Sequence, residues 1–280
     1  MRRIVLMGVV GCFLAAGVAT AAPPTLGQHF DCTDGGTSSC AADDTGCVSN
    51  TSAHLKCSSK IGKLLGKAAY DVIKCHLKQA GQRLKGASEN GAGTSEENCE
   101  DNPGNSAKGK LDAGLAKLTA SGLCDPAQLS NAAVEEAILF GAGPLGLDAS
   151  NANVYCDSSS GALIGDDDAG WVPASASMYK CQGSIATALG KLAVAAIKCH
   201  DKMNMSFFKA KDFDEESCEE IDSLIPTRGA LAKYNRIRDK MIATGTCPPC
   251  LNAAAWDAQA ASALAQINLG NAIVYPCGLP

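Results

Sequence analysis

Two copies of a cysteine–histidine pair are the residues of this sequence whose types and spacing could support chemistry. Residues 73–78 read IKCHLK and residues 197–202 read IKCHDK, which gives the pairs Cys75–His76 and Cys199–His200. A thiolate and an imidazole can bind zinc, and a cysteine beside a histidine is part of covalent haem sites. In an oxidising compartment the same pair can instead be a structural disulfide next to a packed histidine.

Helix geometry places both histidines on a buried face. Each residue advances an α-helix by about 100°, so His76 falls within the apolar stripe of its segment, and His200 has the same angle in the second copy. The apolar stripe consists of Ile61, Leu65, Ala68, Ala69 and Val72, and the lysine face consists of Lys60, Lys63, Lys67, Lys74 and Lys78. Both imidazoles are predicted to be buried, with a carbonyl or hydroxyl as hydrogen-bond partner.

The number of donors near each pair argues against a metal or haem. Covalent haem attachment uses C-x-x-C-H, but positions 72 and 196 are Val72 and Ala196. A structural zinc needs four ligands, and a thiolate ligand competes with disulfide formation. The sequence therefore predicts no resident metal and no cofactor, with His76 and His200 as the candidate ligands if a metal is bound.

The N-terminus predicts export. Residues 1–22 combine two arginines, an apolar run from Ile4 to Val18 and small residues before a proline pair, as in a secretory signal peptide. Its removal leaves 22 basic residues, 29 acidic residues and 14 cysteines. We expect a protein that is secreted, periplasmic or in the cell envelope, without a transmembrane segment after cleavage. The acidic balance and the lack of a basic block argue against nucleic acid as a partner.

The even number of cysteines predicts a framework of about seven disulfides. Antiparallel helices bring the end of one near the start of the next, which predicts the bonds Cys75–Cys99, Cys199–Cys218, Cys57–Cys124 and Cys181–Cys247. Cys250 is then left for Cys277. Cys156 is expected to pair with Cys32, Cys40 or Cys47, without a choice among them.

The chain contains an internal duplication. Residues 61–78 and 185–202 share ten identities in eighteen positions, and the motifs EENCE and NANVYC recur as EESCE and NAIVYPC. Apolar spacing and cap residues predict helices over 58–80, 106–121 and 125–141, and again over 182–204, 228–244 and 251–270.

This pattern predicts an all-α fold of two tandem disulfide-stapled three-helix units, with Cys-containing loops and little or no sheet. The expected order is a signal peptide (1–22), a Cys-rich polar segment (23–56), unit 1 (57–156), a polar linker (157–180) and unit 2 (181–280). The repeated KC-x-x-x-I and KCH-x-K patterns are similar to those of secreted, cysteine-rich helical repeat proteins of bacteria, a group that implies no activity and no functional residues.

Three other motifs are weaker candidates for a site. Cys247-Pro-Pro-Cys250 has redox spacing but lacks a βαβ context, so each cysteine is expected to bond elsewhere. The acidic loops at 31–36, 165–170 and 214–217 could bind calcium, although none has the EF-hand pattern. His29 and His54 lie in the polar N-terminal segment and could belong to a hydrolase site, but no catalytic motif accompanies them.

The sequence favours an exported, non-enzymatic structural or binding module with no catalytic residues. Its partner is an unidentified protein, glycan or small ligand. The alternative is a metal- or haem-binding carrier or sensor that uses the duplicated Cys-His pairs, and a hydrolase is third.

Overall fold

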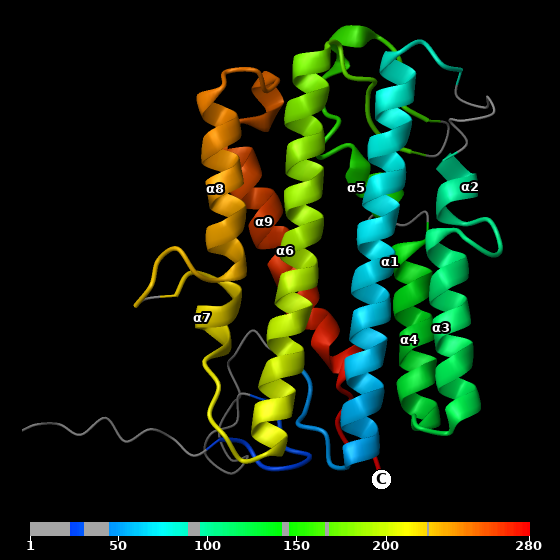
Figure 1. The fold of residues 1–280 in the computed structure, drawn as a ribbon, viewed down its shortest axis with the longest axis vertical. Helices are drawn as coiled ribbons and strands as arrows, with labels where there is room; N and C mark the ends of the chain where they lie inside the picture. Colours follow the sequence, from blue (N-terminus) through cyan, green and yellow to red (C-terminus); the bar gives the residue numbers. More distant parts are fainter. Residues whose placement is uncertain (1–22, 31–44, 89–95, 142–145, 166–167, 223) are drawn as a thin grey trace, which may run out of the picture.

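Two long antiparallel helices form the centre of the molecule. The computed structural model describes residues 23–30, 45–88, 96–141, 146–165, 168–222 and 224–280. Helices α1 (Ser52–Leu84) and α6 (Ala176–Phe208), each of 33 residues, lie side by side and run in opposite directions (Figure 1). β-structure within the described residues is confined to two isolated bridges, His29–Cys47 and Leu163–Trp171. The predicted disulfide-rich, all-α fold class is confirmed.

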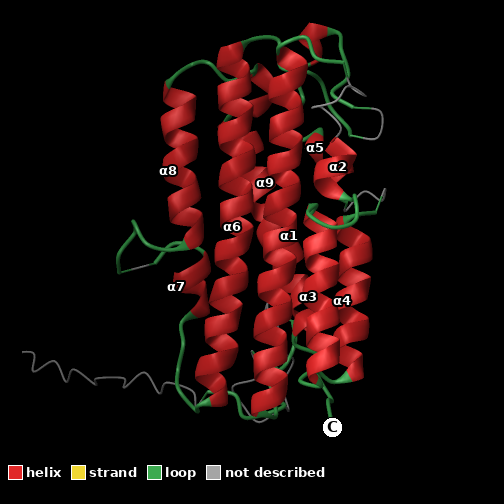
Figure 2. Cartoon of the chain, turned by 45° about the vertical axis from the view of Figure 1, so that its right-hand side comes forward, coloured by secondary structure: helices red, strands yellow, loops and turns green. Residues whose placement is uncertain are grey.

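Shorter helices flank this central pair. They are α2 (Glu96–Glu100), α3 (Ala107–Ser121), α4 (Pro126–Leu139), α5 (Leu147–Asn151), α7 (Glu215–Glu219), α8 (Ala230–Ala243) and α9 (Ala253–Val274), with 3-10 turns at Ser158–Ser160 and Pro249–Leu251. Helices α3 and α4 pack against α1, whereas α8 and α9 pack against α6 (Figure 2). Six helices correspond to the predicted segments, and the short α2, α5 and α7 were not predicted.

Side-chain caps explain why the two long helices begin earlier than predicted. Thr51 accepts a hydrogen bond from the backbone N–H of His54 and begins α1, and Ser175 accepts one from Met178 and begins α6. Such caps satisfy N–H groups that have no partner within the helix. Helix α6 therefore begins inside the segment 157–180 that was predicted to be a polar linker.

Glycines allow α1 and α6 to approach closely. A Cβ atom on Gly190 would lie 2.6 Å from the ring of Tyr70, and one on Gly183 would lie 2.5 Å from Leu77. Both distances are below van der Waals contact, so the absence of a side chain permits this packing.

The division into two units remains a prediction. Helix α4 packs against α9, and one apolar cluster contains Ala80 and Tyr155 together with Trp256. Trp256 is fully buried, and its backbone carbonyl accepts a hydrogen bond from the hydroxyl of Tyr234 at 2.9 Å. The core is therefore shared between the two halves of the sequence.

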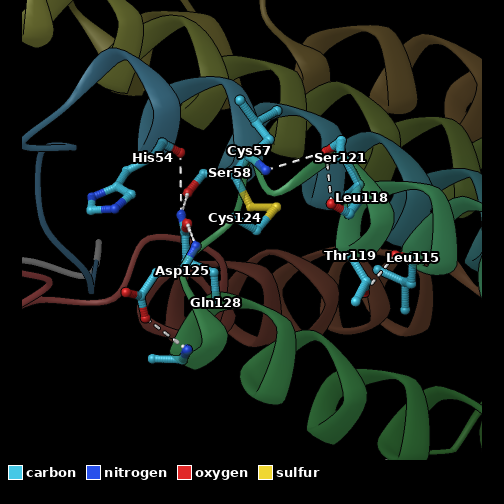
Figure 3. Close-up of a disulfide and its surroundings, with 12 residues drawn as sticks. His54, Cys57, Ser58, Leu115, Leu118, Thr119, Ser121, Cys124, Asp125 and Gln128 are labelled. Atoms are coloured by element: carbon cyan, nitrogen blue, oxygen red, sulfur yellow. Dashed lines mark hydrogen bonds between the residues drawn. A yellow bond between two sulfur atoms is a disulfide. The ribbon is translucent and has the colours of Figure 1, made fainter.

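Four predicted disulfides are confirmed, namely Cys57–Cys124, Cys75–Cys99, Cys181–Cys247 and Cys199–Cys218. Figure 3 shows the first of them, which holds the start of α1 against the loop before α4. Beside this bond, the buried Gln128 side chain donates hydrogen bonds to Ser58 Oγ at 2.9 Å and to the carbonyl of His54 at 3.2 Å (Figure 3).

The predicted Cys250–Cys277 bond is wrong, as is the pairing of Cys156 with an N-terminal cysteine. Cys250 bonds to Cys156, and Cys277 bonds to Cys47. The cause is the length of α9, whose 22 residues span about 33 Å and separate Cys250 from Cys277. Cys32 and Cys40 lie outside the described residues, as does the predicted signal peptide. Among the helices that the structure describes, none is both long and apolar enough to cross a bilayer.

Candidate metal centre

The imidazole of His76 faces four carboxylates. Its Nε2 atom lies 3.0 Å from Asp168 Oδ1, 3.3 Å from Asp148 Oδ1, 3.3 Å from Glu100 Oε2 and 3.7 Å from Glu96 Oε1. The five side chains form two groups that share His76, one with Glu96 and Glu100 and one with Asp148 and Asp168. Within each group the ligand atoms lie within 4.8 Å of one another. We call these five residues the His76 centre.

A disulfide fixes half of this centre. Cys75 precedes His76 on α1, Cys99 precedes Glu100 on α2, and the two cysteines are bonded. Glu96 and Glu100 are four positions apart, so they point from the same side of α2. The cysteine beside the histidine thus holds the α2 carboxylates against the imidazole.

The other half of the centre comes from the end of predicted unit 1 and from the segment that was predicted to be a linker. Asp148 lies in the first turn of α5, and Asp168 lies in the loop that follows the Ser158–Ser160 turn. The backbone N–H of Ala169 donates to the carbonyl of Asp148 at 3.1 Å, and the Asn151 side chain donates to the carbonyl of Ala169 at 3.1 Å. These bonds hold the two aspartates beside each other.

The donor atoms of the centre are buried and poorly satisfied. His76, Glu96, Glu100 and Asp168 are each at most 6% exposed, whereas the side chain of Asp148 is 20% exposed. His76 Nε2, Glu96 Oε1, Glu100 Oε2 and Asp148 Oδ1 have no hydrogen-bond partner among the described residues. A buried polar atom without a partner costs about 1–3 kcal/mol. Several such atoms beside one imidazole make this cluster a candidate cation site.

Electrostatics reinforce the need for positive charge at the centre. Burial, together with the neighbouring Glu100, raises the pKa of Glu96 from 4.5 to about 10. Burial alone would lower the pKa of His76, but the carboxylates of Asp148, Asp168 and Glu100 outweigh burial and raise it well above its ordinary value. The metal-free centre therefore favours bound protons, which a metal ion would replace.

A smaller group of the same kind surrounds His200. Its Nε2 atom lies 2.9 Å from Glu219 Oε2 and 3.4 Å from Glu215 Oε1. The bond Cys199–Cys218 fixes α7 to α6 as Cys75–Cys99 fixes α2 to α1. Figure 1 shows α2 and α7 on opposite sides of the antiparallel central pair, with α2 beside its upper half and α7 beside its lower half.

The prediction that both histidines are buried is confirmed, at 3% exposure for His76 and 1% for His200. Their neighbours differ from the prediction, because the groups facing Nε2 are carboxylates and not a carbonyl or hydroxyl. Cys75 and Cys199 are both in disulfides, so neither sulfur is available to ligate zinc or to attach haem in this state.

The sequence analysis did not identify the carboxylates that face the two histidines, although their signals were present. EENCE and EESCE were recognised as repeat landmarks, but the spacing E-x-x-x-E was not recognised as two ligands on one helix face. Asp168 lies in the acidic loop 165–170 that was considered for calcium, and Glu215 lies in the acidic loop 214–217. The third acidic loop, 31–36, lies outside the described residues.

The remaining sequence candidates are placed elsewhere. Cys247 and Cys250 bond to Cys181 and Cys156, as expected for a C-x-x-C motif whose cysteines pair with other partners. The ring of His54 pairs with Asn50 Oδ1 at 2.5 Å, and His29 forms a backbone bridge with Cys47.

No family model, curated protein or solved structure matches this chain.

Proposed function

We propose that this protein is an exported, disulfide-stapled binding module that holds a divalent transition-metal ion at the His76 centre. The observation that carries the proposal is that four carboxylate oxygens lie within 3.7 Å of one buried imidazole nitrogen. Buried carboxylates need either protons or a cation, and the number of donors is sufficient for a metal ion.

The donor set favours a particular class of metal. Carboxylate oxygens suit Mg²⁺, Ca²⁺ and Mn²⁺, whereas imidazole suits transition metals. Mn²⁺ is both a transition metal and an ion that suits carboxylate oxygens, so it matches a set of one imidazole nitrogen and four carboxylate oxygens. Fe²⁺ is the next best match, since imidazole suits iron as well. We therefore expect Mn²⁺ to bind more tightly than Ca²⁺ or Mg²⁺.

The number of protein ligands favours binding over catalysis. Five protein donors would fill all but one position of an octahedral ion, whereas catalytic zinc centres commonly have only three protein ligands. Asp148 is the most exposed of the five residues, so we assign it to the side from which the ion enters. This supports a non-enzymatic module that carries, stores or senses a metal.

The disulfides support the proposal that the protein is exported. Six bonds are present among the described residues, and disulfides persist in oxidising environments such as the bacterial periplasm and the exterior. Thiolate metal sites are disfavoured there, whereas carboxylate and imidazole ligands are unaffected by oxidation.

Metal binding by the oxidised, full-length secreted chain tests the proposal. The chain would be stripped with a chelator, dialysed against Mn²⁺ and analysed for bound metal. Glu100→Gln removes a ligand charge without changing its size and is expected to remove one ion per chain. The matched control is Glu97→Gln, because Glu97 is exposed on the same short helix.

The proposal fails if Glu100→Gln and Glu97→Gln bind the same amount of Mn²⁺ as the unmodified chain. Asp148→Asn provides a second variant of the centre, in case Glu100→Gln does not fold. Its side chain is partly exposed, so the substitution perturbs the core less.

A further inference from the structure

We infer that His200, Glu215 and Glu219 form a second, weaker site for a divalent transition metal. The inference uses the same ligand chemistry as the proposed function but different residues, so either can fail without the other. Glu219 Oε2 lies 2.9 Å from His200 Nε2, and Glu215 Oε1 lies 3.4 Å from the same atom. We call these three residues the His200 site.

Burial gives the first argument for a ligand at this site. Glu219 is 2% exposed, and its Oε2 atom has no hydrogen-bond partner within the part of the chain that the structure describes. This oxygen points at the imidazole of His200, which is 1% exposed. A buried, unsatisfied carboxylate oxygen aimed at a histidine nitrogen is the arrangement that a metal ion bridges.

The duplicated architecture gives the second argument. The His200 site repeats the helix-borne half of the His76 centre, with a histidine after a disulfide-bonded cysteine and two glutamates in an E-x-x-x-E helix. It is formed by α6 and α7, which correspond to α1 and α2, on the opposite side of the central helix pair. A single structural histidine would not require two buried carboxylates in this arrangement.

Charge explains why one divalent ion fits the site. With a neutral imidazole, the two glutamates carry two negative charges, which one divalent cation balances. With a protonated imidazole and no metal, one buried negative charge is left over, and buried charges without compensation are costly. The metal-bound form of the His200 site is therefore the electrically neutral one.

Fewer charges also make this site weaker than the His76 centre. Aligning the repeated motifs NANVYC and NAIVYPC places Asn268 at the position of Asp148, so an amide replaces one carboxylate. The metal-ligating group that the described residues form here has two carboxylates, against four around His76. Because ligand charge count tunes cation affinity, we expect binding about 10–100-fold weaker than at the His76 centre.

The two histidines line one cavity. A cavity of about 270 Å³ between the central helices is lined mainly by apolar side chains, and both His76 and His200 contribute to its wall. Of the three residues of the His200 site, Glu219 also lines a second cavity, together with Asn268.

A Mn²⁺ titration of the metal-free, full-length chain, followed by calorimetry and by metal analysis, tests this inference. The unmodified chain is expected to bind two ions with affinities about 10–100-fold apart. Glu219→Gln should abolish the weaker event and retain the tighter one, which also shows that the variant is folded. Glu215→Gln should have the same effect, and the control Glu216→Gln, at an exposed position of α7, should bind both ions.

The outcomes separate the two proposals. A single event that Glu219→Gln leaves unchanged and Glu100→Gln removes would overturn the His200 site and leave the proposed function standing. A single event that only Glu219→Gln removes would do the reverse. If no Mn²⁺ binds to the unmodified chain, both proposals are wrong.

Discussion

His76 Nε2 lies 3.0 Å from Asp168 Oδ1, although the histidine is on α1 and the aspartate is in the loop that precedes α6. A metal ion held between them would connect the first central helix to the segment that leads into the second. The His76 centre thus joins parts of the fold that no described disulfide connects directly, because Cys75–Cys99 reaches only α2.

Mn²⁺ should therefore stabilise the folded chain. A ligand present at a hundredfold excess over its dissociation constant raises the free energy of unfolding by about 2.7 kcal/mol per site. We expect thermal unfolding to shift upward with added Mn²⁺, and the shift to be smaller in Glu100→Gln but intact in Glu97→Gln. An equal shift in both variants would place the binding site elsewhere.

The stability of the metal-free chain should fall as the pH rises. The pKa of Glu96 is raised from 4.5 to about 10, so between these values the folded chain binds more protons than the unfolded chain. The free energy of unfolding then decreases with pH. The raised pKa of His76 acts in the same direction, since its stabilising contribution is lost as the pH rises through the folded-state value. Urea unfolding with a chelator at about pH 5 and about pH 8 measures this difference.

Bound metal should reverse this decrease of stability with rising pH. Ligands bind metal in their deprotonated form, so stabilisation by Mn²⁺ should increase between the same two pH values. The control is Glu96→Gln, in which the part of the metal-free slope caused by this carboxyl is absent. A metal-free chain whose stability is independent of pH, or rises with it, would contradict the assigned role of Glu96.

The disulfide beside His76 should matter for metal binding as well as for stability. Removing a native disulfide typically costs about 2–5 kcal/mol. Replacing both Cys75 and Cys99 by alanine should also weaken Mn²⁺ binding at the His76 centre about 10–100-fold, because the bond positions the ligands. The matched control replaces Cys57 and Cys124, which form a disulfide at the other end of α1. Equal metal affinity in the two double variants would argue against this positioning role.

Close packing of the central helices gives a prediction independent of metal. Gly190→Ala places a methyl group against the ring of Tyr70 and should lower the free energy of unfolding by about 1–3 kcal/mol. Gly270→Ala, in a helical position with no atom within 4 Å of the new Cβ, should be neutral or stabilising by up to about 1 kcal/mol. Chemical denaturation compares them, and similar losses in both would refute the packing argument.

Features that depend on local sequence could be predicted. Apolar spacing and caps identified six helices, and helical phase identified the burial of His76 and His200. Four disulfides followed from the antiparallel order of neighbouring helices. The bonds of Cys156 and Cys250 could not be derived in this way, because they depend on how a 22-residue helix crosses the other half of the molecule.

The same distinction between local sequence and tertiary packing applies to the residues of the candidate site. Glu96 and Glu100 could have been identified from their spacing together with the predicted Cys75–Cys99 bond, which brings α2 to His76. Asp148 and Asp168 could not, since they reach the histidine through tertiary packing of α5 and the loop after it. Sequence reasoning therefore counted fewer candidate donors near His76 than the structure places there.

The ligand environment of bound Mn²⁺ is the most direct test of the central claim. Pulsed electron paramagnetic resonance on the Glu219→Gln chain, in which the weaker site is removed, should show Mn²⁺ coupled to one imidazole nitrogen. That coupling should disappear in a variant that also carries His76→Gln, and it should persist with the control His54→Gln on the same helix. A spectrum of bound Mn²⁺ without nitrogen coupling, or one unchanged by His76→Gln, would contradict the account.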